Sequence, residues 1–435
     1  MEVSVIGAGL AGCEAAYYLA SHGVKVKLYD MKPQKFTPAH SNKNFAELVC
    51  SNSLKNIQLS NAAGLLKEEL RILNSLVIEA ADFTTVAAGN ALSVNREDFS
   101  EFITKRIKEN ENIEVVCGEV TSIDSSKPCI ICTGPLTSDD LLKDLAKIVG
   151  QEYLYFFDAS APIVTKNSIN MESAYFASRY DKGDADYLNC PMSIDEYTAF
   201  YNELISAQRV KLKDFENEKV FEGCMPVEVL ASRGFKSLLF GPLKPVGLRE
   251  PKTGKTPYAV LQLRREDSEG TMYNLVGFQT NLTYGEQARV IKMIPALSSA
   301  EFVKYGVMHK NSFINAPTLL NRYYQLKKAP NIFIGGQLSG VEGYVESVSS
   351  GMTAAINMLR YINSESLIEF DETTCIGALA HFITNASPKY FQPMNANWGI
   401  IKEVEFSEKD KIKNKELRAN YALEKIKSIK TQYNL

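Results

Sequence analysis

The first 31 residues constrain the fold more than any other stretch of this chain. A short apolar run rich in β-branched residues, 2–6, is followed by glycines at positions 7, 9 and 12. The Ala-rich residues 13–21 then have the composition of a helix, and a second apolar run, 24–29, ends at Asp30. A strand, a glycine turn, a helix, a second strand and a terminal acid, in this order, predict a dinucleotide-binding βαβ unit.

The glycine turn and the acid have separate roles in such a unit. One glycine allows the tight turn, one lets the backbone approach a pyrophosphate, and one lets the helix pack closely on the strand. The start of the helix offers free N–H groups and a partial positive charge to the phosphates. The terminal acid can accept hydrogen bonds from a ribose hydroxyl. The predicted cofactor contacts here are Gly7, Ala8, Gly9, Leu10, Ala11, Gly12 and Asp30.

Length and composition narrow the class of protein. The chain has 435 residues, which favours two domains, and it is 45% hydrophobic and 23% charged, as is common for soluble globular proteins. The sequence shows neither a signal peptide nor an apolar run of membrane-spanning length, so we expect a cytoplasmic protein with no membrane partner and with its eight cysteines reduced. The net charge of −3 argues against a generally basic nucleic-acid binder but leaves room for a local basic patch.

The middle of the chain differs in composition from both ends. Between about residues 180 and 330 it contains more Tyr, Phe, Pro and Gly and less alternation of strands and helices, and the alternation returns afterwards. We therefore predict an α/β fold whose Rossmann-type dinucleotide-binding domain is split into 1–180 and 330–435 around an inserted α+β domain, 181–329. The Lys/Glu-rich stretch 406–435 is expected to be a helix with a solvated face.

A second glycine-rich turn favours FAD over a nicotinamide nucleotide as the resident cofactor. Residues 331–335 have the pattern of a strand, and a helix follows from about residue 343. In flavoproteins that begin with a dinucleotide fold, such a late helix N-terminus often lies against the flavin ring and stabilises negative charge on it. An ordinary βα unit is the alternative. The predicted contacts from this turn, with the glycine that follows strand 128–133, are Gly134, Gly335, Gly336, Gln337, Glu342 and Gly343.

Two of the cysteines, Cys50 and Cys224, lie in polar or Gly/Pro-rich surroundings. We expect an apolar helical turn before Cys50 and a loop at Cys224. A nucleophilic thiol needs some exposure and a lowered pKa, which such positions supply, so each of the two is either structural or catalytic. Cys129 and Cys132 have C-x-x-C spacing, but the isoleucines between them favour a buried strand over a redox or zinc role.

The four histidines, at positions 22, 40, 309 and 381, lack the spacing of metal ligands, and we predict no metal site. His22 and His381 are expected to be structural. His40 is expected in a loop near the nucleotide, and His309 stays open between a structural and a functional role.

Long sequence blocks resemble one family, the folate- and FAD-dependent RNA (uracil-5-)-methyltransferases of the TrmFO type. The blocks follow the family order from the first residues to about residue 399. The last blocks also look like the related GidA-type flavoenzymes, which modify the tRNA wobble uridine and are longer. The matching blocks are GAGLAGCEAA, TPAHS, FAELVCSNSLKN, TGPLTS, SAPIV, EGCMPVEVLASRG, LLFGPLKPVGL, YGVMHKNSFINAP, GGQLSGVEGYVESVSSGM and FQPMNANWG.

The resemblance implies a particular chemistry. FAD would lie on residues 7–12 and against residues 335–351, NAD(P)H would reduce it, and methylenetetrahydrofolate would supply a one-carbon unit that passes through the flavin to carbon 5 of a uridine in RNA. Carried over by block, Cys224 would be the thiolate that adds to carbon 6, and Cys50 its partner thiol and the base for the carbon-5 proton. The division of roles between these thiols stays open. The expected folate or RNA contacts are His309, Tyr344 and Glu346.

The block FQTNLTYGEQARV departs from the family's usual FQTHLKWGEQKRV. Asn281, Thr283 and Ala288 stand where basic residues or histidine are usual, and each lost phosphate contact would weaken RNA binding. The target is therefore the tRNA T-loop, by resemblance, or a uridine of 23S rRNA. A GidA-like wobble-uridine enzyme, a non-catalytic protein that binds FAD and RNA, and a small-molecule FAD oxidoreductase are the other readings. The sequence leaves the oligomeric state open.

Overall fold

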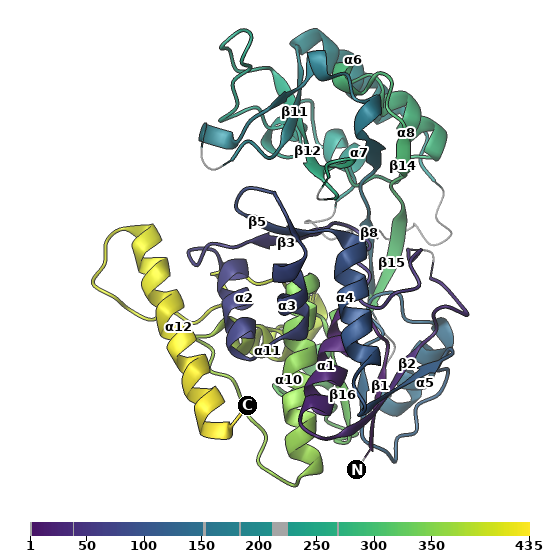
Figure 1. Cartoon of the computed structure of the whole chain (residues 1–435), viewed down its shortest axis with the longest axis vertical. Helices are drawn as coiled ribbons and strands as arrows, with labels where there is room; N and C mark the ends of the chain where they lie inside the picture. Colours follow the sequence, from purple (N-terminus) through teal and green to yellow (C-terminus); the bar gives the residue numbers. More distant parts are fainter. Residues whose placement is uncertain (1, 38, 151–153, 182–183, 211–224, 268) are drawn as a thin grey trace.

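The described residues form two hydrophobic cores, one in each lobe of the molecule (Figure 1). The structure is a computed structural model that describes residues 2–37, 39–150, 154–181, 184–210, 225–267 and 269–435. The larger core gathers buried side chains from both ends of the chain, from Val3 to Ile426. The smaller core uses the middle of the chain, from Val164 to Ala300. Both termini lie in the larger lobe.

A parallel sheet organises the larger lobe. Its strand order within the described residues is β16-β7-β1-β2-β6, and every neighbouring pair is parallel. The chain leaves β1 toward β2 on one side, whereas β7 lies on the other side, so the order reverses at β1. A crevice opens at the carboxyl ends of the strands at such a reversal, and ligands bind there. The strands are β1 (Glu2–Ile6), β2 (Lys25–Asp30), β6 (Ile113–Cys117), β7 (Cys129–Ile131) and β16 (Ile332–Ile334).

Helix α1 (Leu10–Ser21) packs against α10 (Tyr344–Ile362), although the sequence separates them by more than 300 residues. The approach is close, because a Cβ placed on Gly351 would lie 2.4 Å from the carbonyl oxygen of Ala11. A side chain at this position would push the two helices apart. The contact therefore brings the N-terminal ends of α1 and α10 to the same region of the fold (Figure 1).

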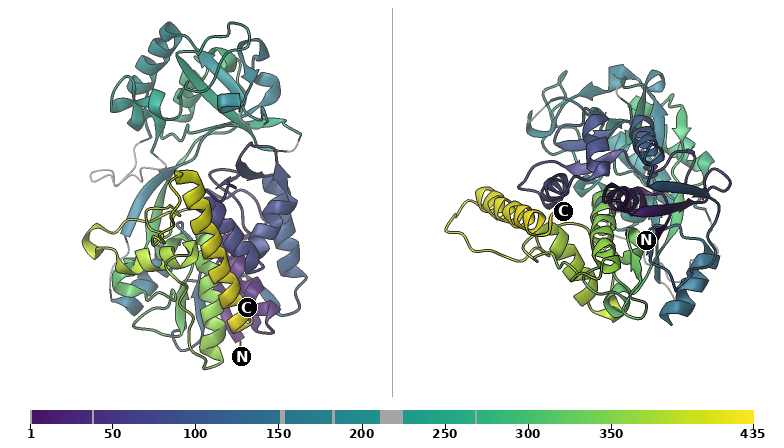
Figure 2. Two further views of the ribbon diagram at one scale, coloured as in Figure 1. Left: turned by 90° about the vertical axis from the view of Figure 1, so that its left-hand side faces the viewer. Right: turned by 60° about the horizontal axis from the view of Figure 1, so that its bottom comes forward.

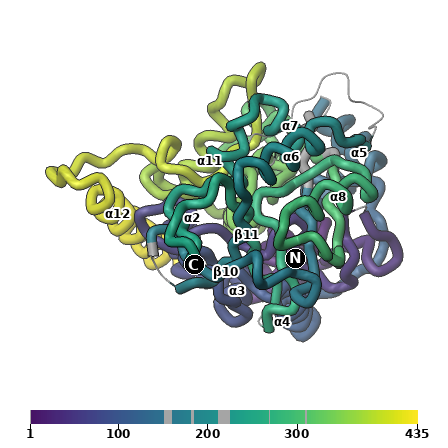
Figure 3. Tube along the Cα trace, turned by 90° about the horizontal axis from the view of Figure 1, so that it is seen from above, coloured from purple at the N-terminus to yellow at the C-terminus, as the bar shows by residue number. Residues whose placement is uncertain are grey.

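Other elements of the larger lobe surround this pair. The three-stranded sheet β3-β5-β4 lies on the side of the larger lobe that faces the smaller one (Figure 1). Helix α12 packs along α2 and lies on the outside of the molecule (Figures 2 and 3). Most of α12 faces solvent, as its charge pattern predicts. The elements are β3 (Ser53–Asn56), β4 (Thr85–Val86), β5 (Ala91–Val94), α2 (Ala62–Ile72), α3 (Leu76–Phe83), α4 (Arg96–Lys108), α5 (Asp139–Val149), α9 (Ala316–Leu319), α11 (Cys375–Asn385) and α12 (Lys411–Tyr433).

The smaller lobe contains an antiparallel sheet with the order β10-β11-β12-β13-β9-β14 in the part of the chain that the structure describes. A ribbon of β8 and β15 runs between the lobes (Figure 1). The elements are β8 (Leu154–Ala159), β9 (Ile163–Thr165), β10 (Tyr175–Phe176), β11 (Leu188–Met192), β12 (Ala259–Arg265), β13 (Met272–Leu275), β14 (Phe302–Lys304), β15 (Met308–Phe313), α6 (Ile194–Ser206), α7 (Val227–Ser232) and α8 (Tyr284–Ile291). Short 3₁₀ turns are η1 (Lys166–Ser168), η2 (Met171–Ser173), η3 (Arg179–Asp181), η6 (Ser237–Phe240), η7 (Pro295–Leu297), η8 (Gln337–Ser339) and η9 (Pro388–Tyr390).

The strands of the smaller sheet indicate that the inserted domain begins before residue 181. Strands β9 and β10 precede residue 181, yet they pair with β13 and β11. We propose that the inserted domain begins after β8 and ends before β15, so that the ribbon of these two strands joins it to the rest of the chain. None of the described helices is both long and apolar enough to cross a membrane.

One local expectation was wrong. The stretch before Cys50 was predicted to be a helical turn, but residues 41–52 contain neither helix nor strand. The apolar side chains of Phe45 and Leu48 are buried in the larger core from an irregular backbone. Tertiary contacts rather than helical hydrogen bonds therefore fix the conformation of this segment.

Candidate active site

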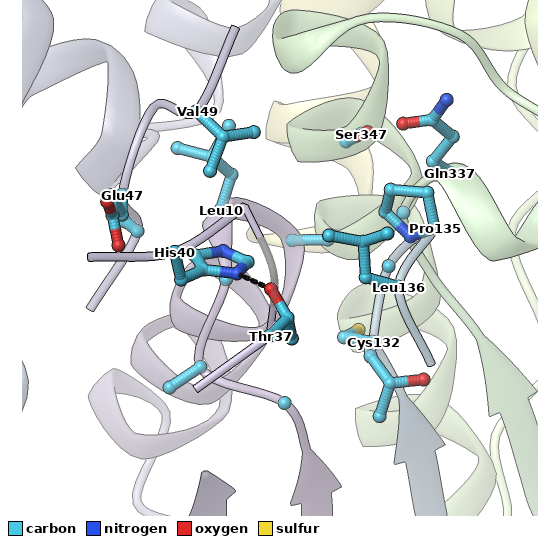
Figure 4. Close-up of a pocket in the computed structure, with 18 of the residues that line it drawn as sticks. Leu10, Thr37, His40, Glu47, Val49, Cys132, Pro135, Leu136, Gln337 and Ser347 are labelled. Atoms are coloured by element: carbon cyan, nitrogen blue, oxygen red, sulfur yellow. Dashed lines mark hydrogen bonds between the residues drawn. The ribbon is translucent and has the colours of Figure 1, made fainter. Parts of the chain in front are cut away.

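A cavity of about 410 Å³ lies where the order of the parallel strands reverses (Figure 4). This volume is typical of small-molecule sites. Its wall includes the turn after β1, the irregular segment before β3 and the turn that leads into α10, together with residues at the ends of β2, β6 and β7. Residues predicted from the sequence that line it are Gly7, Ala8, Gly9, Leu10, Ala11, Asp30, Cys50, Gly134, Gly336, Gln337, Glu342, Gly343 and Tyr344.

The turn after β1 has the geometry that its glycines predict. Gly7 has a φ of +99°, which side chains rarely tolerate, and a Cβ on Gly12 would lie 1.8 Å from the carbonyl oxygen of Gly7. Gly9, by contrast, faces open space, and apart from its neighbours along the chain no protein atom lies within 4 Å of an added Cβ. Gly9 is also the N-cap of α1, whose first turn has no side-chain cap. The free N–H groups of this helix end therefore face the cavity, as binding of a pyrophosphate requires.

Asp30, the last residue of β2, connects the strand end to the glycine turn. One carboxylate oxygen accepts a hydrogen bond from the backbone N–H of Ala8 at 2.9 Å, and the other accepts one from the N–H of Lys32 at 2.8 Å. A carboxylate oxygen has more than one lone pair, so Asp30 can still accept a bond from a ribose hydroxyl. This arrangement fits the role predicted from its position.

The second helix end at the cavity belongs to α10. Its N-cap, Gly343, has a φ of +119°, and this helix also lacks a side-chain cap. Gly335 does not line the cavity. A Cβ on it would lie 2.8 Å from Sγ of Cys132 and 3.2 Å from Cα of Gly351, so it allows close packing. Two uncapped helix N-termini that open into one cavity fit FAD, with phosphates at α1 and the flavin ring near α10.

Replacing Asp30 with alanine is expected to weaken FAD binding by about 10- to 100-fold, the value of one charge-assisted hydrogen bond. Titration of the purified apoprotein with FAD, followed by flavin fluorescence, measures this change. Asp124→Ala is the matched control, because it removes an exposed carboxylate that bonds only locally, to Ser126 and Lys127. Equal affinity in both variants would remove Asp30 from the predicted contacts.

Cys50 lies at the cavity on a segment that Tyr344 holds. The backbone N–H groups of Cys50 and Ser51 donate hydrogen bonds to the hydroxyl oxygen of Tyr344, at 2.8 and 3.2 Å. Burial and the nearby Cys50 raise the pKa of the Tyr344 phenol far above its usual value, so the hydroxyl stays neutral. The first residue of α10 thus fixes the position of the predicted reactive thiol.

The structure does not bring every predicted residue to the cavity. Cys224 lies outside the described residues, as does the side chain of His309, whose backbone pairs with Asp158 in the β8–β15 ribbon. Glu346 is 1% exposed and lies behind the wall, where it accepts bonds from Nζ of Lys55 at 2.8 Å and from the N–H of Ala396 at 3.0 Å. Lys55 itself lines the cavity. Substrate contacts by His309, Tyr344 and Glu346 stay predictions.

The sequence reasoning missed other residues of the wall, among them Glu47 and Lys55. The signal for both was the block FAELVCSNSLKN, which contains them but was used only for its cysteine. His40, expected near the nucleotide, lines the cavity with Nδ1 2.6 Å from Oγ1 of Thr37, and Figure 4 shows this pair across from Leu136. Burial lowers the pKa of His40, which favours the neutral imidazole.

Cys129 and Cys132 are buried in or directly after β7, as their apolar neighbours predict. Burial raises the pKa of Cys129 to about 12 and that of Cys132 further. Thiols with such pKa values are poor nucleophiles. Within the described ranges, no group of three or more His, Cys, Asp or Glu side chains is arranged to hold a metal ion.

Comparison with known proteins decides the family. The sequence model described as "Glucose inhibited division protein A" matches residues 2–366. A protein named methylenetetrahydrofolate–tRNA-(uracil-5-)-methyltransferase TrmFO from Acetivibrio thermocellus is 56% identical over 432 residues, 99% of each chain. The chain belongs to the TrmFO family. A TrmFO protein of the same full name from Bacillus subtilis is 54% identical over 427 residues, 98% of each chain. The resemblance inferred from the sequence blocks is therefore confirmed.

A solved structure places this TrmFO-family chain in a wider fold group. GidA from Aquifex aeolicus, in its form I crystal, superposes with a TM-score of 0.73 at 14% sequence identity, over 99% of this chain and 76% of that one. This likeness confirms the predicted fold class, a GidA-like α/β fold with a Rossmann-type parallel sheet.

Proposed function

We propose that this chain is an enzyme that forms 5-methyluridine in tRNA, with FAD as cofactor, methylenetetrahydrofolate as the one-carbon donor and NAD(P)H as reductant. The observation that carries the proposal is that the dinucleotide turn and Cys50 open into the same cavity. The names of relatives at 54–56% identity support the reaction and the substrate class. The cytoplasm, predicted from the sequence, is the expected location.

The proposed reaction needs two side chains that handle carbon 6 and carbon 5 of uracil. Bound FAD supplies the reducing equivalents that convert the transferred one-carbon unit into a methyl group. Carbon 5 of uracil is a poor nucleophile until a thiolate adds at carbon 6, a role we give to Cys224 on the resemblance alone. Cys50 then accepts the proton that leaves carbon 5. The target uridine has to leave the base stack to reach these groups.

Among the predicted substrate contacts, Tyr344 has the best support. Tyr344 lines the cavity, and its hydroxyl accepts a hydrogen bond from the backbone of Cys50. The same side chain would therefore contact a bound substrate and hold Cys50 in place. Glu346 would act through Lys55, whose side chain it holds at the cavity. His309 is proposed from its sequence block only.

The structure of the altered block 278–290 gives less support to 23S rRNA as the substrate than its sequence suggests. Asn281 was expected to mark a lost phosphate contact, but it is 5% exposed, and its side-chain amide donates to the carbonyl oxygen of Val210 at 3.2 Å. The side chain at this position points into the protein, so its identity does not set contacts with RNA. Thr283 and Ala288 are half-buried. We therefore keep tRNA as the proposed substrate and 23S rRNA as the alternative.

The test offers both RNAs to one enzyme. Purified FAD-loaded protein with NADPH and labelled methylenetetrahydrofolate is incubated in parallel with unmodified tRNA and unmodified 23S rRNA, and labelled 5-methyluridine is measured after nuclease digestion. We expect label in tRNA, in a folate-dependent manner. Label in 23S rRNA alone would replace the substrate but keep the chemistry. Label in neither RNA, with FAD bound and reducible by NADPH, would contradict the proposed function and favour the oxidoreductase or non-catalytic readings.

A further inference from the structure

Two cations bind the carbonyl groups directly before Cys50. Arg96, the first residue of α4, donates from Nη1 to the carbonyl oxygens of Leu48 at 2.6 Å and Val49 at 3.4 Å. Lys304, the last residue of β14, donates from Nζ to the carbonyl oxygen of Val49 at 3.1 Å. The two charges come from different lobes and meet at the segment that carries the thiol.

A third cation holds the residues directly after Cys50. Arg264 of β12 donates from Nη2 to Oγ of Ser51 at 2.7 Å and from Nε to Oδ1 of Asn52 at 2.9 Å. The amide of Asn52 donates in turn to the carbonyl oxygen of Arg265 at 2.9 Å. Arg264 is 7% exposed and Asn52 is fully buried, so water competes little for these bonds. The smaller lobe therefore bonds the Cys50 segment through Lys304 and Arg264, and the larger lobe bonds it through Arg96.

Around this segment Arg264 and Glu266 are buried, and Arg96, Lys304 and Glu47 are half-buried. These five groups carry three positive and two negative charges. Glu266 is ion-paired with Arg96, with Nε and Oε2 2.6 Å apart. Neither Lys304 nor Arg264 has a carboxylate within 4 Å among the residues that the structure describes. Desolvated cations are costly unless an anion lies near them. A thiolate at Cys50 would be such an anion.

The electrostatic interactions of the neighbouring groups also favour a thiolate at Cys50. Burial and Arg96 lower the pKa of Lys304, while negative charge at Cys50, Glu47 and Glu266 raises it. By reciprocity, the ammonium of Lys304 favours the ionised form of that thiol. His40 and Tyr344 are held neutral by burial and add no charge. Among the residues that the structure describes, the charged or titratable groups near Cys50 include His40, Glu47, Lys55, Arg96, Arg264, Glu266, Lys304 and Tyr344.

We propose that Arg96 and Lys304 keep the thiol of Cys50 ionised, and that Arg264 of the smaller lobe fixes the segment in the place where these charges act. The three are positioning residues. The inference rests on the proposed function, in which Cys50 accepts the proton from carbon 5, because a thiolate can accept that proton and a neutral thiol cannot. Reactivity of Cys50 would then depend on the docking of the two lobes.

The test measures the ionisation of Cys50 itself. FAD-loaded protein is alkylated with iodoacetamide between pH 5 and 10, and the rate at the Cys50 peptide is followed by mass spectrometry. In the wild type we expect the midpoint of the pH profile below about 8.5, the usual value for cysteine. In Lys304→Met, which keeps the length of the side chain but loses the charge, we expect the midpoint to rise by about one pH unit. Lys304→Arg, which keeps the charge, is expected to stay near the wild type.

Matched variants distinguish the effect of losing the charge of Lys304 from the effect of a damaged fold. Lys327 likewise donates to a backbone carbonyl, that of Pro317 at 3.0 Å, but it does not face Cys50, so Lys327→Met should leave the midpoint unchanged. Arg264→Lys keeps the charge but one ammonium cannot make both bonds of the guanidinium fork, and we expect its midpoint to rise as well. If thermal unfolding shows that Lys304→Met is not folded, Arg264→Lys carries the test.

A wild-type midpoint at the usual value for cysteine would overturn the proposal. So would unchanged midpoints in folded Lys304→Met and Arg264→Lys. Because alkylation needs neither folate nor RNA, its outcome is independent of the methylation assay. Failure of the proposed function and failure of this inference can therefore be distinguished.

Discussion

Replacement of Cys50 with alanine is expected to lower the rate of 5-methyluridine formation by roughly 10²- to 10⁴-fold, the usual contribution of a positioned base. FAD should stay bound, because Tyr344, Arg96, Lys304 and Arg264 hold the segment at residues 48–52 through bonds that the substitution leaves in place. Single-turnover methylation with labelled methylenetetrahydrofolate and unmodified tRNA, beside the FAD absorbance spectrum, measures both effects.

A matched cysteine provides the control for this loss. Cys117, at the exposed end of β6, does not line the cavity, and Cys117→Ala should retain full activity. Cys50→Ser is expected to be nearly as inactive as Cys50→Ala, since a hydroxyl is far less acidic than a thiol. Methylation at the wild-type rate in Cys50→Ala would assign the proton transfer to another group. Formation of a covalent RNA–protein adduct in Cys50→Ala but not in Cys224→Ala would assign the addition at carbon 6 to Cys224.

Replacement of Gly12 with alanine is expected to abolish FAD binding and to destabilise the fold. The added Cβ would lie 1.8 Å from the carbonyl oxygen of Gly7 and 3.2 Å from Cβ of Cys132, so the turn and α1 have to move apart. Overpacking of this kind costs about 1–3 kcal/mol of unfolding free energy. The shift also moves the N-terminus of α1 away from the phosphates, so we expect the purified variant to be colourless. Urea unfolding and the flavin absorbance measure the two effects.

Gly9→Ala is the matched comparison within the same turn. Apart from its neighbours along the chain, no protein atom lies within 4 Å of a Cβ at this position, and its φ of −76° suits any residue. The apoprotein should therefore keep the wild-type stability, although FAD binding weakens because the methyl group points into the cavity. Normal FAD binding by Gly12→Ala would mean that the turn adjusts more easily than its packing indicates.

Local signals in the sequence determined the dinucleotide unit. The predicted strand 2–6 is β1 to the residue, and the predicted second strand, 24–29, differs from β2 by one residue at each end. The predicted late strand, 331–335, and the helix predicted from about residue 343 correspond to β16 and α10. These elements follow from the spacing of glycines and apolar residues within about 30 residues of chain. The glycines act through the backbone, and the apolar residues act through the face that they bury.

The surroundings of Cys50 were decided by the tertiary structure. The sequence marked the thiol but predicted a helical turn before it, and nothing local pointed to Arg96, Arg264, Lys304 or Tyr344 as its neighbours. Those residues lie between 46 and 294 positions away along the chain. Likewise, the altered residue Asn281 was expected at an RNA-facing surface and is buried.

There is a physical reason why the sequence predicted the dinucleotide unit but not the surroundings of Cys50. A glycine turn, a cap or an amphipathic period is specified by a few consecutive residues, so the sequence by itself determined the dinucleotide unit, and its long blocks determined the family. Charge and burial at a site depend on which distant segments pack together, and that is settled by the whole core. The tertiary structure alone therefore decided that the smaller lobe supplies Arg264 and Lys304 to the segment of Cys50.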